Sequence, residues 1–167
     1  MSAGPTDRGT GTAPAARRAA RVLCLDPDGA LLLVGGTDPA RPHAPAVWLP
    51  PGGGVAAGES AGAAARRELF EETGLWLDDV GPAVTGRTVE FDFAGRRFRQ
   101  RETWFAVRVA RFEPRPTAWT RWERRSLVGT TWWRLGDPPP GVIPDDVVRL
   151  GEGAHRDLPA TPRRVGL

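Results

Sequence analysis

Alternation of apolar and polar residues predicts a chain built mainly from β-strands. The clearest alternation covers residues 85–93 and 98–112, which are separated by the turn sequence Ala94-Gly95-Arg96. A period of two over such lengths is typical of half-buried strands. We therefore expect two long strands that turn back on each other.

Shorter apolar segments add further strands. Residues 18–25 and 30–34 flank Asp26-Pro27-Asp28-Gly29, a strong turn sequence, so we expect a hairpin or neighbouring strands. Residues 47–49 predict a short strand that enters a glycine-rich loop, and residues 131–135 predict a last strand.

The two ends of the chain lack such periodicity. Residues 1–16 are mostly Gly, Ala, Thr and Pro with scattered charge, and we expect a flexible arm there. Residues 144–150 follow a proline-rich stretch and predict a short helix, and we expect the tail from residue 151 to be loose. With 167 residues the chain is long enough for one well-packed domain, which we place at residues 17–150.

The stretch from residue 53 to 75, GGVAAGESAGAAARRELFEETGL, predicts the main helix. Ser60 suits the N-cap, and Gly74 suits the left-handed residue that follows a helix. The stripe of small or apolar residues on this helix would let it lie close to a sheet; it consists of Ala61, Ala64, Ala65 and Leu69.

Three glutamates on this helix carry the candidate chemistry. Glu68, Glu71 and Glu72 are three or four residues apart, so their carboxylates can converge on one face. Like charges at this spacing repel, and Mg²⁺, which binds carboxylate oxygens and substrate phosphates, would compensate them. A glutamate-rich face is more often simply solvated. The glycine loop, Glu59 and Arg67 at fixed offsets favour a functional site.

The spacing of Gly53, Glu59, Arg67-Glu68, Glu71-Glu72 and Gly74 resembles the complete signature of the Nudix family of pyrophosphohydrolases. The resemblance implies an α/β fold, with a mixed β-sheet in an α/β/α sandwich. It also implies hydrolysis of a nucleoside diphosphate linked to another moiety, by attack of a metal-activated water on phosphorus.

The resemblance assigns roles to individual residues. It implies that Glu68 and Glu72 are the principal Mg²⁺ ligands, with Mn²⁺ as an alternative ion. It further implies that Glu71 binds another metal or polarises the water, and that the Gly53 carbonyl completes a coordination shell. Arg67 is expected to pair with Glu59 and fix the loop against the helix.

Residues outside the signature are less clearly assigned. In several Nudix subfamilies a further glutamate assists the metals, and Glu123 is the candidate here, with Glu102 as the competitor. Either could equally be a surface charge. The substrate candidates are aromatic residues for stacking and an arginine for phosphate or ribose, although core and surface roles are alternatives; we name Phe91, Trp104 and Arg99.

Composition narrows the class of protein. The net charge is +3 and the pI about 10.7, but every basic residue other than histidine is Arg and these are dispersed, so we expect no nucleic acid as partner. The nucleotide-type small molecule expected as substrate is what the Nudix resemblance implies. The single Cys24 excludes an intramolecular disulfide, and no apolar run reaches membrane-spanning length. We expect a cytoplasmic protein that does not bind membranes, and a homodimer is possible.

Two alternatives to a hydrolase stay open. A non-catalytic Nudix domain that senses a nucleotide would be expected to have lost one of Glu68, Glu71 or Glu72, and all three are present. An isomerase acting on isoprenoid diphosphates would need an active-site cysteine, and Cys24 lies in an apolar segment that predicts a buried strand.

Overall fold

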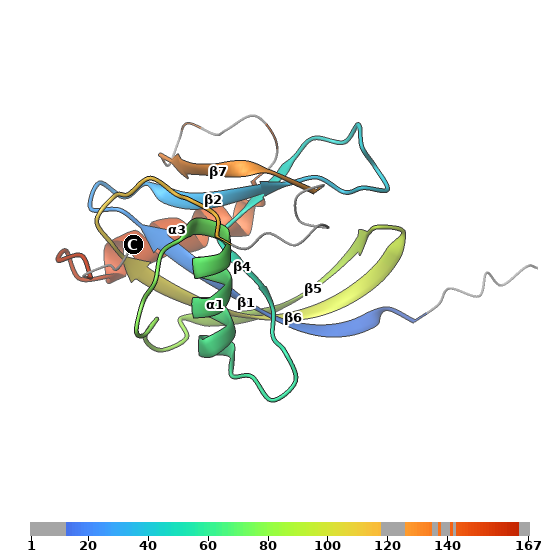
Figure 1. Cartoon of the computed structure of the whole chain (residues 1–167), viewed down its shortest axis with the longest axis horizontal. Helices are drawn as coiled ribbons and strands as arrows, with labels where there is room; N and C mark the ends of the chain where they lie inside the picture. The colour runs from blue at the N-terminus through green and yellow to red at the C-terminus, as the bar shows by residue number, and fades with distance from the viewer. Residues whose placement is uncertain (1–12, 118–125, 135–136, 138–140, 142, 164–167) are drawn as a thin grey trace, which may run out of the picture.

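The computed structural model describes residues 13–117, 126–134, 137, 141 and 143–163. Within them the chain forms a strand-rich domain with two helices (Figure 1). The elements in chain order are β1 (Ala15–Leu25), β2 (Leu31–Gly36), β3 (Val47–Leu49), β4 (Gly52–Gly54), α1 (Ala61–Thr73), β5 (Thr85–Phe93), β6 (Arg96–Arg108), β7 (Leu127–Trp133) and α3 (Asp145–Asp157).

The strands form one mixed sheet in the order β3-β2-β1-β6-β5, with β4 paired to β1 and β7 paired to β2. Strands β5 and β6 form the expected antiparallel pair, and β1 runs parallel to β6 along its whole length. The expected pairing of the first two strands is reduced to Leu25 opposite Leu31. Strands β1 and β2 are therefore neighbours that diverge, and the short strand β4 pairs with the middle of β1.

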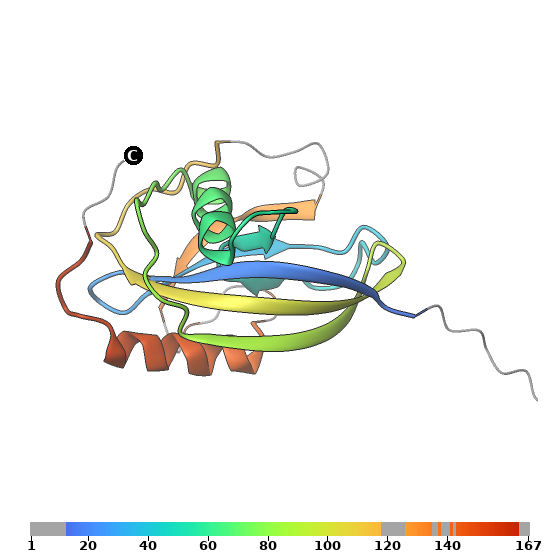
Figure 2. The same cartoon turned by 90° about the horizontal axis from the view of Figure 1, so that it is seen from below.

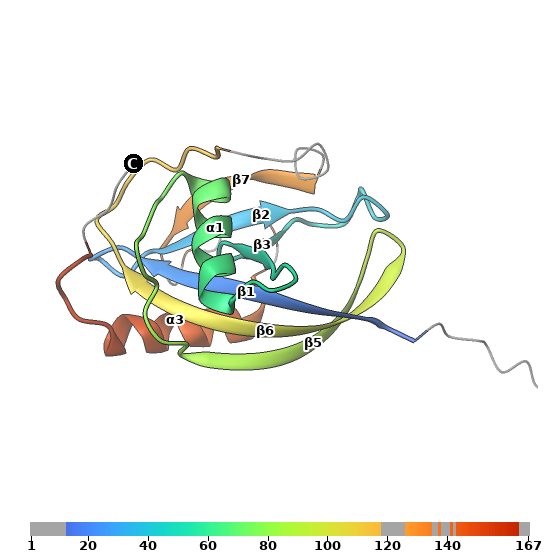
Figure 3. The ribbon, with the colours of Figure 1, turned by 60° about the horizontal axis from the view of Figure 1, so that its bottom comes forward.

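The two helices lie on opposite faces of the sheet, as the view from below shows (Figure 2), while Figure 3 shows α1 crossing in front of the strands. Apolar residues of β1 alternate between the two cores: Val22 and Cys24 pack under α1, and Leu23 and Leu25 pack under α3. This arrangement confirms the predicted α/β/α layering.

The C-terminal region is more ordered than the sequence suggested. Helix α3 continues to Asp157, so both the predicted end at residue 150 and the loose tail from Gly151 are wrong. The reason is burial: Val147, Gly151 and Ala154 recur at helical spacing and are buried against the sheet. Beyond the helix, the Arg163 backbone N–H donates to the Arg108 carbonyl at 2.7 Å.

Strand boundaries also differ where pairing partners lie far away in the chain. Strand β7 begins at Leu127, four residues before the predicted start at 131, because it pairs with β2 as far as Gly36. Strand β1 begins at Ala15, inside the predicted arm, because Ala15 pairs with Phe98. Residues 1–12 lie outside the described residues. Among the described helices, none has the length and apolarity needed to cross a membrane.

Candidate active site

Helix α1 begins and ends where the sequence predicts. The Ser60 side chain accepts a hydrogen bond from the Ala63 N–H at 3.1 Å, which satisfies one free donor of the first turn. Gly74 has a φ of 77° and its N–H donates to the Phe70 carbonyl, as expected of a glycine that terminates a helix. These caps fix the position of the glutamates between them.

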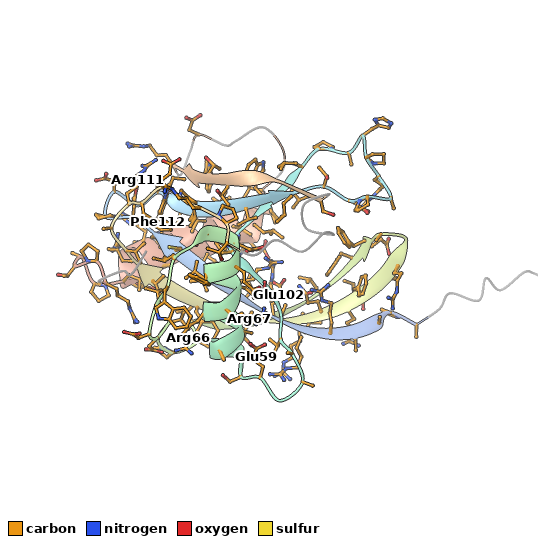
Figure 4. The ribbon with its side chains drawn as sticks, in the orientation of Figure 1. Glu59, Arg66, Arg67, Glu102, Arg111 and Phe112 are labelled. Atoms are coloured by element: carbon orange, nitrogen blue, oxygen red, sulfur yellow. The ribbon has the colours of Figure 1, made fainter. Side chains whose placement is uncertain are left out.

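Arg67 joins the loop to the helix. Its Nε and Nη2 donate to the two carboxylate oxygens of Glu59, each at 3.0 Å, and Nη2 also donates to the Gly54 carbonyl at 2.9 Å. The predicted pairing is therefore confirmed, in the two-pronged geometry that favours arginine. The Arg67 hydrogen bonds hold the pKa of Glu59 below its ordinary value, while Glu59 above all raises the pKa of Arg67. Figure 4 shows Glu59 and Arg67 near the start of α1.

Glu68 and Glu72 lie against the glycine strand β4, and each is only 8% exposed. The Gly52 N–H donates to Glu72 Oε2 at 2.9 Å. A Cβ atom at Gly53 would fall 2.5 Å from the carboxyl carbon of Glu68, so any larger residue there would have to displace this carboxylate. Gly52 was not singled out from the sequence, since its role depends on its pairing with β1 and on Glu72.

The three helix glutamates do not gather in the way their spacing suggested. Arg67 Nη1 donates to Glu68 at 2.7 Å and to Glu71 at 3.3 Å, whereas Glu72 binds the Gly52 backbone. In the part of the chain that the structure describes, no group of three or more His, Cys, Asp or Glu side chains is arranged to hold a metal ion. The expected convergence of all three carboxylates is therefore not seen.

A divalent cation nevertheless fits the residues present. Hard cations bind oxygen ligands. Glu68 and Glu72 supply carboxylates beside the backbone of β4, where the Glu68 carboxylate occupies the space that a side chain at Gly53 would take. Glu71 is more accessible, with its side chain 33% exposed. The donor set is thus two sheltered carboxylates, one accessible carboxylate and the neighbouring backbone of β4.

Glu102 is a buried ion-pair centre. It is 2% exposed and accepts hydrogen bonds from Arg21 Nε at 3.1 Å, Arg87 Nε at 2.6 Å, Gln100 Nε2 at 2.6 Å and Trp104 Nε1 at 3.0 Å. Burial by itself raises the pKa of Glu102, but the two arginines and Gln100 outweigh it and the pKa is lowered. With four donors on its carboxylate, Glu102 is not supported as the additional metal ligand. Its competitor, Glu123, lies outside the described residues.

The three predicted substrate residues do not form one wall. Phe91 is half-buried and its ring lies 5.7 Å from that of Phe98, but Trp104 is wholly buried in the core under α3. Arg99 is exposed and lies on the opposite face of β6, where its Nε is 4.0 Å from the Glu90 carboxylate. Of the three, only Phe91 keeps an accessible position beside another aromatic ring.

Cys24 is fully buried in the core under α1. Burial, with a smaller contribution from Asp26, raises the pKa of its thiol. A buried, protonated thiol does not suit the cysteine that an isomerase of this fold would need.

Comparison with known proteins identifies the family. The profile of the NUDIX domain matches residues 15–151, and the chain therefore belongs to the NUDIX family. The RNA pyrophosphohydrolase of Bradyrhizobium diazoefficiens is 43% identical over 74 residues, which cover 37% of this chain and 42% of that protein. The RNA pyrophosphohydrolase of Afipia carboxidovorans is 35% identical over 105 residues, covering 52% and 58%. The chain thus spans about half the length of these curated relatives.

Solved structures share the fold at low sequence identity. A MutT NUDIX hydrolase from Burkholderia pseudomallei has a TM-score of 0.59 at 21% identity, over 83% of this chain and 97% of that one. A MutT protein from Methanosarcina mazei has a TM-score of 0.58 at 19% identity, over 88% and 98%. These similarities confirm the Nudix fold that the sequence predicted.

Proposed function

We propose that this protein hydrolyses a pyrophosphate bond in a nucleoside diphosphate linked to another moiety, with Mg²⁺ as cofactor and Mn²⁺ as an alternative. The observation that carries the proposal is the pair of sheltered carboxylates, Glu68 and Glu72, held against the glycine strand β4. Carboxylates at such a sheltered position supply the oxygen ligands that Mg²⁺ prefers.

Each residue has a distinct task in this proposal. Glu68 and Glu72 hold the divalent cation. When bound, such an ion neutralises diphosphate charge and lowers the pKa of a coordinated water. Glu71, whose side chain is 33% exposed, orients the attacking water and accepts its proton. Arg67 positions Glu68 and Glu71 and, through Glu59, keeps the loop in place.

The test of the proposed function also includes RNA 5′ ends as candidate substrates. The sequence predicted no nucleic-acid partner, but the matching relatives are named RNA pyrophosphohydrolases. RNA with a 5′-triphosphate therefore belongs in the substrate panel beside nucleoside triphosphates, including oxidised ones, and ADP-ribose. A cytoplasmic location and a homodimer stay predictions.

The test is metal-dependent turnover by the wild type and by Glu72→Gln. Gln keeps the shape and an oxygen that can accept from the Gly52 N–H, so the fold is expected to persist. Loss of the charge should lower kcat/KM by about a hundredfold or more and weaken Mn²⁺ binding measured by water proton relaxation. Glu152→Gln, on the exposed side of α3, is the matched control.

Two results would overturn this assignment. Normal turnover by Glu72→Gln would exclude Glu72 as a metal ligand. A folded wild type that binds nucleotides in calorimetry but turns over none of the panel with Mg²⁺ or Mn²⁺ would favour the non-catalytic sensor.

A further inference from the structure

One face of strands β1, β5 and β6 carries arginine, phenylalanine and glutamine side chains to which the proposed hydrolysis at the α1 glutamates assigns no role. Register places Arg17 opposite Gln100, and Phe91 opposite Phe98, so their side chains share this face. Arg21 and Arg87 lie on the same face through their bonds to Glu102. We call this surface the β1–β5–β6 face; its argued members are Arg17, Arg21, Arg87, Phe91, Phe98 and Gln100.

Two arginines lie close to the Phe98 ring. The guanidinium carbon of Arg17 lies 5.6 Å from the Phe98 ring centroid and that of Arg96 lies 5.4 Å away. Contacts of this kind at accessible positions are worth about 0.5–1 kcal/mol, so an anion can readily draw either arginine off the ring. Burial, and to a smaller extent the charge of Arg21, lower the pKa of Arg17 against the opposing effect of Glu102 and Glu68.

Gln100 supplies an acceptor without a partner. The residue is 2% exposed, and its Oε1 has no hydrogen bond among the described residues, although its Nε2 donates to Glu102 at 2.6 Å. Because the Glu102 carboxylate is an acceptor, a flip of the Gln100 amide would place the amide oxygen against the carboxylate and lose this hydrogen bond. Gln100 Oε1 is therefore fixed as an acceptor, and an unsatisfied buried acceptor lowers stability unless a ligand supplies a donor.

The β1–β5–β6 face lies on the α3 side of the sheet and α1 on the other, and the glycine strand β4, which Glu68 and Glu72 contact, borders both. Strand β1 pairs with the glycine strand β4 on one side and with β6 on the other, so β4 and β6 are two strand spacings, about 10 Å, apart. Glu102 and Glu68 both act to raise the pKa of Arg17, so this arginine lies within electrostatic range of both carboxylates. A nucleoside attached to a diphosphate at β4 could reach across this interval.

From these observations we infer that the β1–β5–β6 face binds the nucleobase, with Phe98 as the stacking platform and Gln100 as the residue that selects the base. The inference rests on the proposed function, which supplies the nucleotide. Substrate phosphate draws Arg17 off Phe98, the base stacks on the exposed ring beside Phe91, and an N–H on the base edge donates to Gln100 Oε1. Glu102 acts as a positioning residue, since it fixes the orientation of the Gln100 amide.

The experiment measures kcat and KM for ATP, GTP, CTP and UTP with Gln100→Met. Methionine keeps the length of the side chain and removes the acceptor. KM for the nucleotide that the wild type prefers should rise about tenfold or more with kcat little changed, while KM for the least preferred one changes less than about twofold. Arg101→Gln, one residue away on the opposite face of β6, is the control and should match the wild type.

A second variant tests the stacking platform independently of the selection. Phe98→Leu, at a half-buried position, should raise KM for all four nucleotides by about fivefold or more, because it removes the stacking surface but not the acceptor. Equal changes for all four nucleotides with Gln100→Met, or no change, would overturn the role of Gln100. An unchanged KM with Phe98→Leu would overturn the platform.

Dissociation constants for the four nucleotides from calorimetry separate this inference from the proposed function. A wild type without metal-dependent turnover would refute the proposed hydrolysis. Loss of base selectivity in nucleotide binding by Gln100→Met would still support nucleobase binding at the β1–β5–β6 face. Turnover with unaltered selectivity in Gln100→Met would refute the inference and leave the hydrolase standing.

Discussion

Replacing Glu102 by Gln tests whether the buried charges on β1, β5 and β6 depend on one carboxylate. The substitution keeps the shape of the side chain but removes the negative charge that pairs with both Arg21 and Arg87, whose side chains are 13% and 21% exposed. It also turns an acceptor into an amide whose NH₂ must face one of the donors that now bind Glu102.

The expected cost is about 3 kcal/mol of unfolding free energy. Breaking a buried ion pair from one side costs about 3–5 kcal/mol, because the partner charge stays buried. Here the value falls at the lower end, since Arg87 keeps its ion pair with Asp146 and Arg21 keeps its hydrogen bond to the Pro50 carbonyl. For a domain of this size, 3 kcal/mol corresponds to a fall in Tm of roughly 6–12 °C.

Thermal unfolding followed by circular dichroism gives the comparison, with Glu90→Gln as the matched control. Glu90 is on the neighbouring strand, its side chain is 44% exposed, and its arginine partners lie at 3.5 and 4.0 Å, so its loss should change Tm by no more than about 2 °C. A Glu102→Gln protein that melts within 2 °C of the wild type, or no lower than the control, would refute the reasoning.

The pH dependence of this difference follows from the lowered pKa of Glu102. A carboxyl whose folded pKa lies below its unfolded value stabilises the fold fully above the unfolded pKa, near 4.3, and loses that contribution as pH falls through the folded pKa. Urea unfolding should therefore show a constant gap between wild type and Glu102→Gln at neutral pH, which narrows below about pH 4. A gap that widens on acidification would contradict the ion-pair interpretation.

Three further substitutions or treatments test other parts of the structure. Arg67→Lys should lower kcat/KM and weaken Mn²⁺ binding, because lysine cannot bond both Glu59 oxygens and the Gly54 carbonyl; retained wild-type values would exclude the positioning role. Cys24 should react with a thiol reagent only after unfolding in urea, since it is buried with a raised pKa, and rapid native labelling would contradict this. Arg108→Met should lower the urea unfolding free energy by about 2–3 kcal/mol, because three backbone carbonyls lose a charged donor; an unchanged midpoint would show that these bonds contribute nothing.

Local signals in the sequence were sufficient for the helix, the caps and the Arg67 contacts. These features are local in the chain: Ser60 and Gly74 cap the helix, and Arg67 bonds to Glu59 only eight residues away. Such interactions form with little help from distant residues. The long β5–β6 pair was predictable for a similar reason, since its strands alternate and meet at an adjacent turn.

Features that depend on distant partners could not be predicted in this way. Trp104 and Arg99 seemed equivalent as substrate residues, but register on β6 puts Trp104 in the core and Arg99 on the other, exposed face. Gln100 carries no signal in the sequence, because its meaning arises only when Glu102 binds its amide and the buried oxygen is left without a donor. The early start of β7 has the same origin in its pairing with β2.

The extension of α3 determines where the domain can be cut. A protein trimmed to the segment that matches the family, residues 15–151, would lose the helical residues 152–157, including buried Ala154. It would also lose the His155 and Pro159 carbonyls, leaving the nearly buried Arg108 guanidinium with the Asp26 carbonyl alone among its backbone acceptors. The practical boundary for expression, fusion or transplantation of this domain is therefore Arg163, whose backbone still bonds to Arg108.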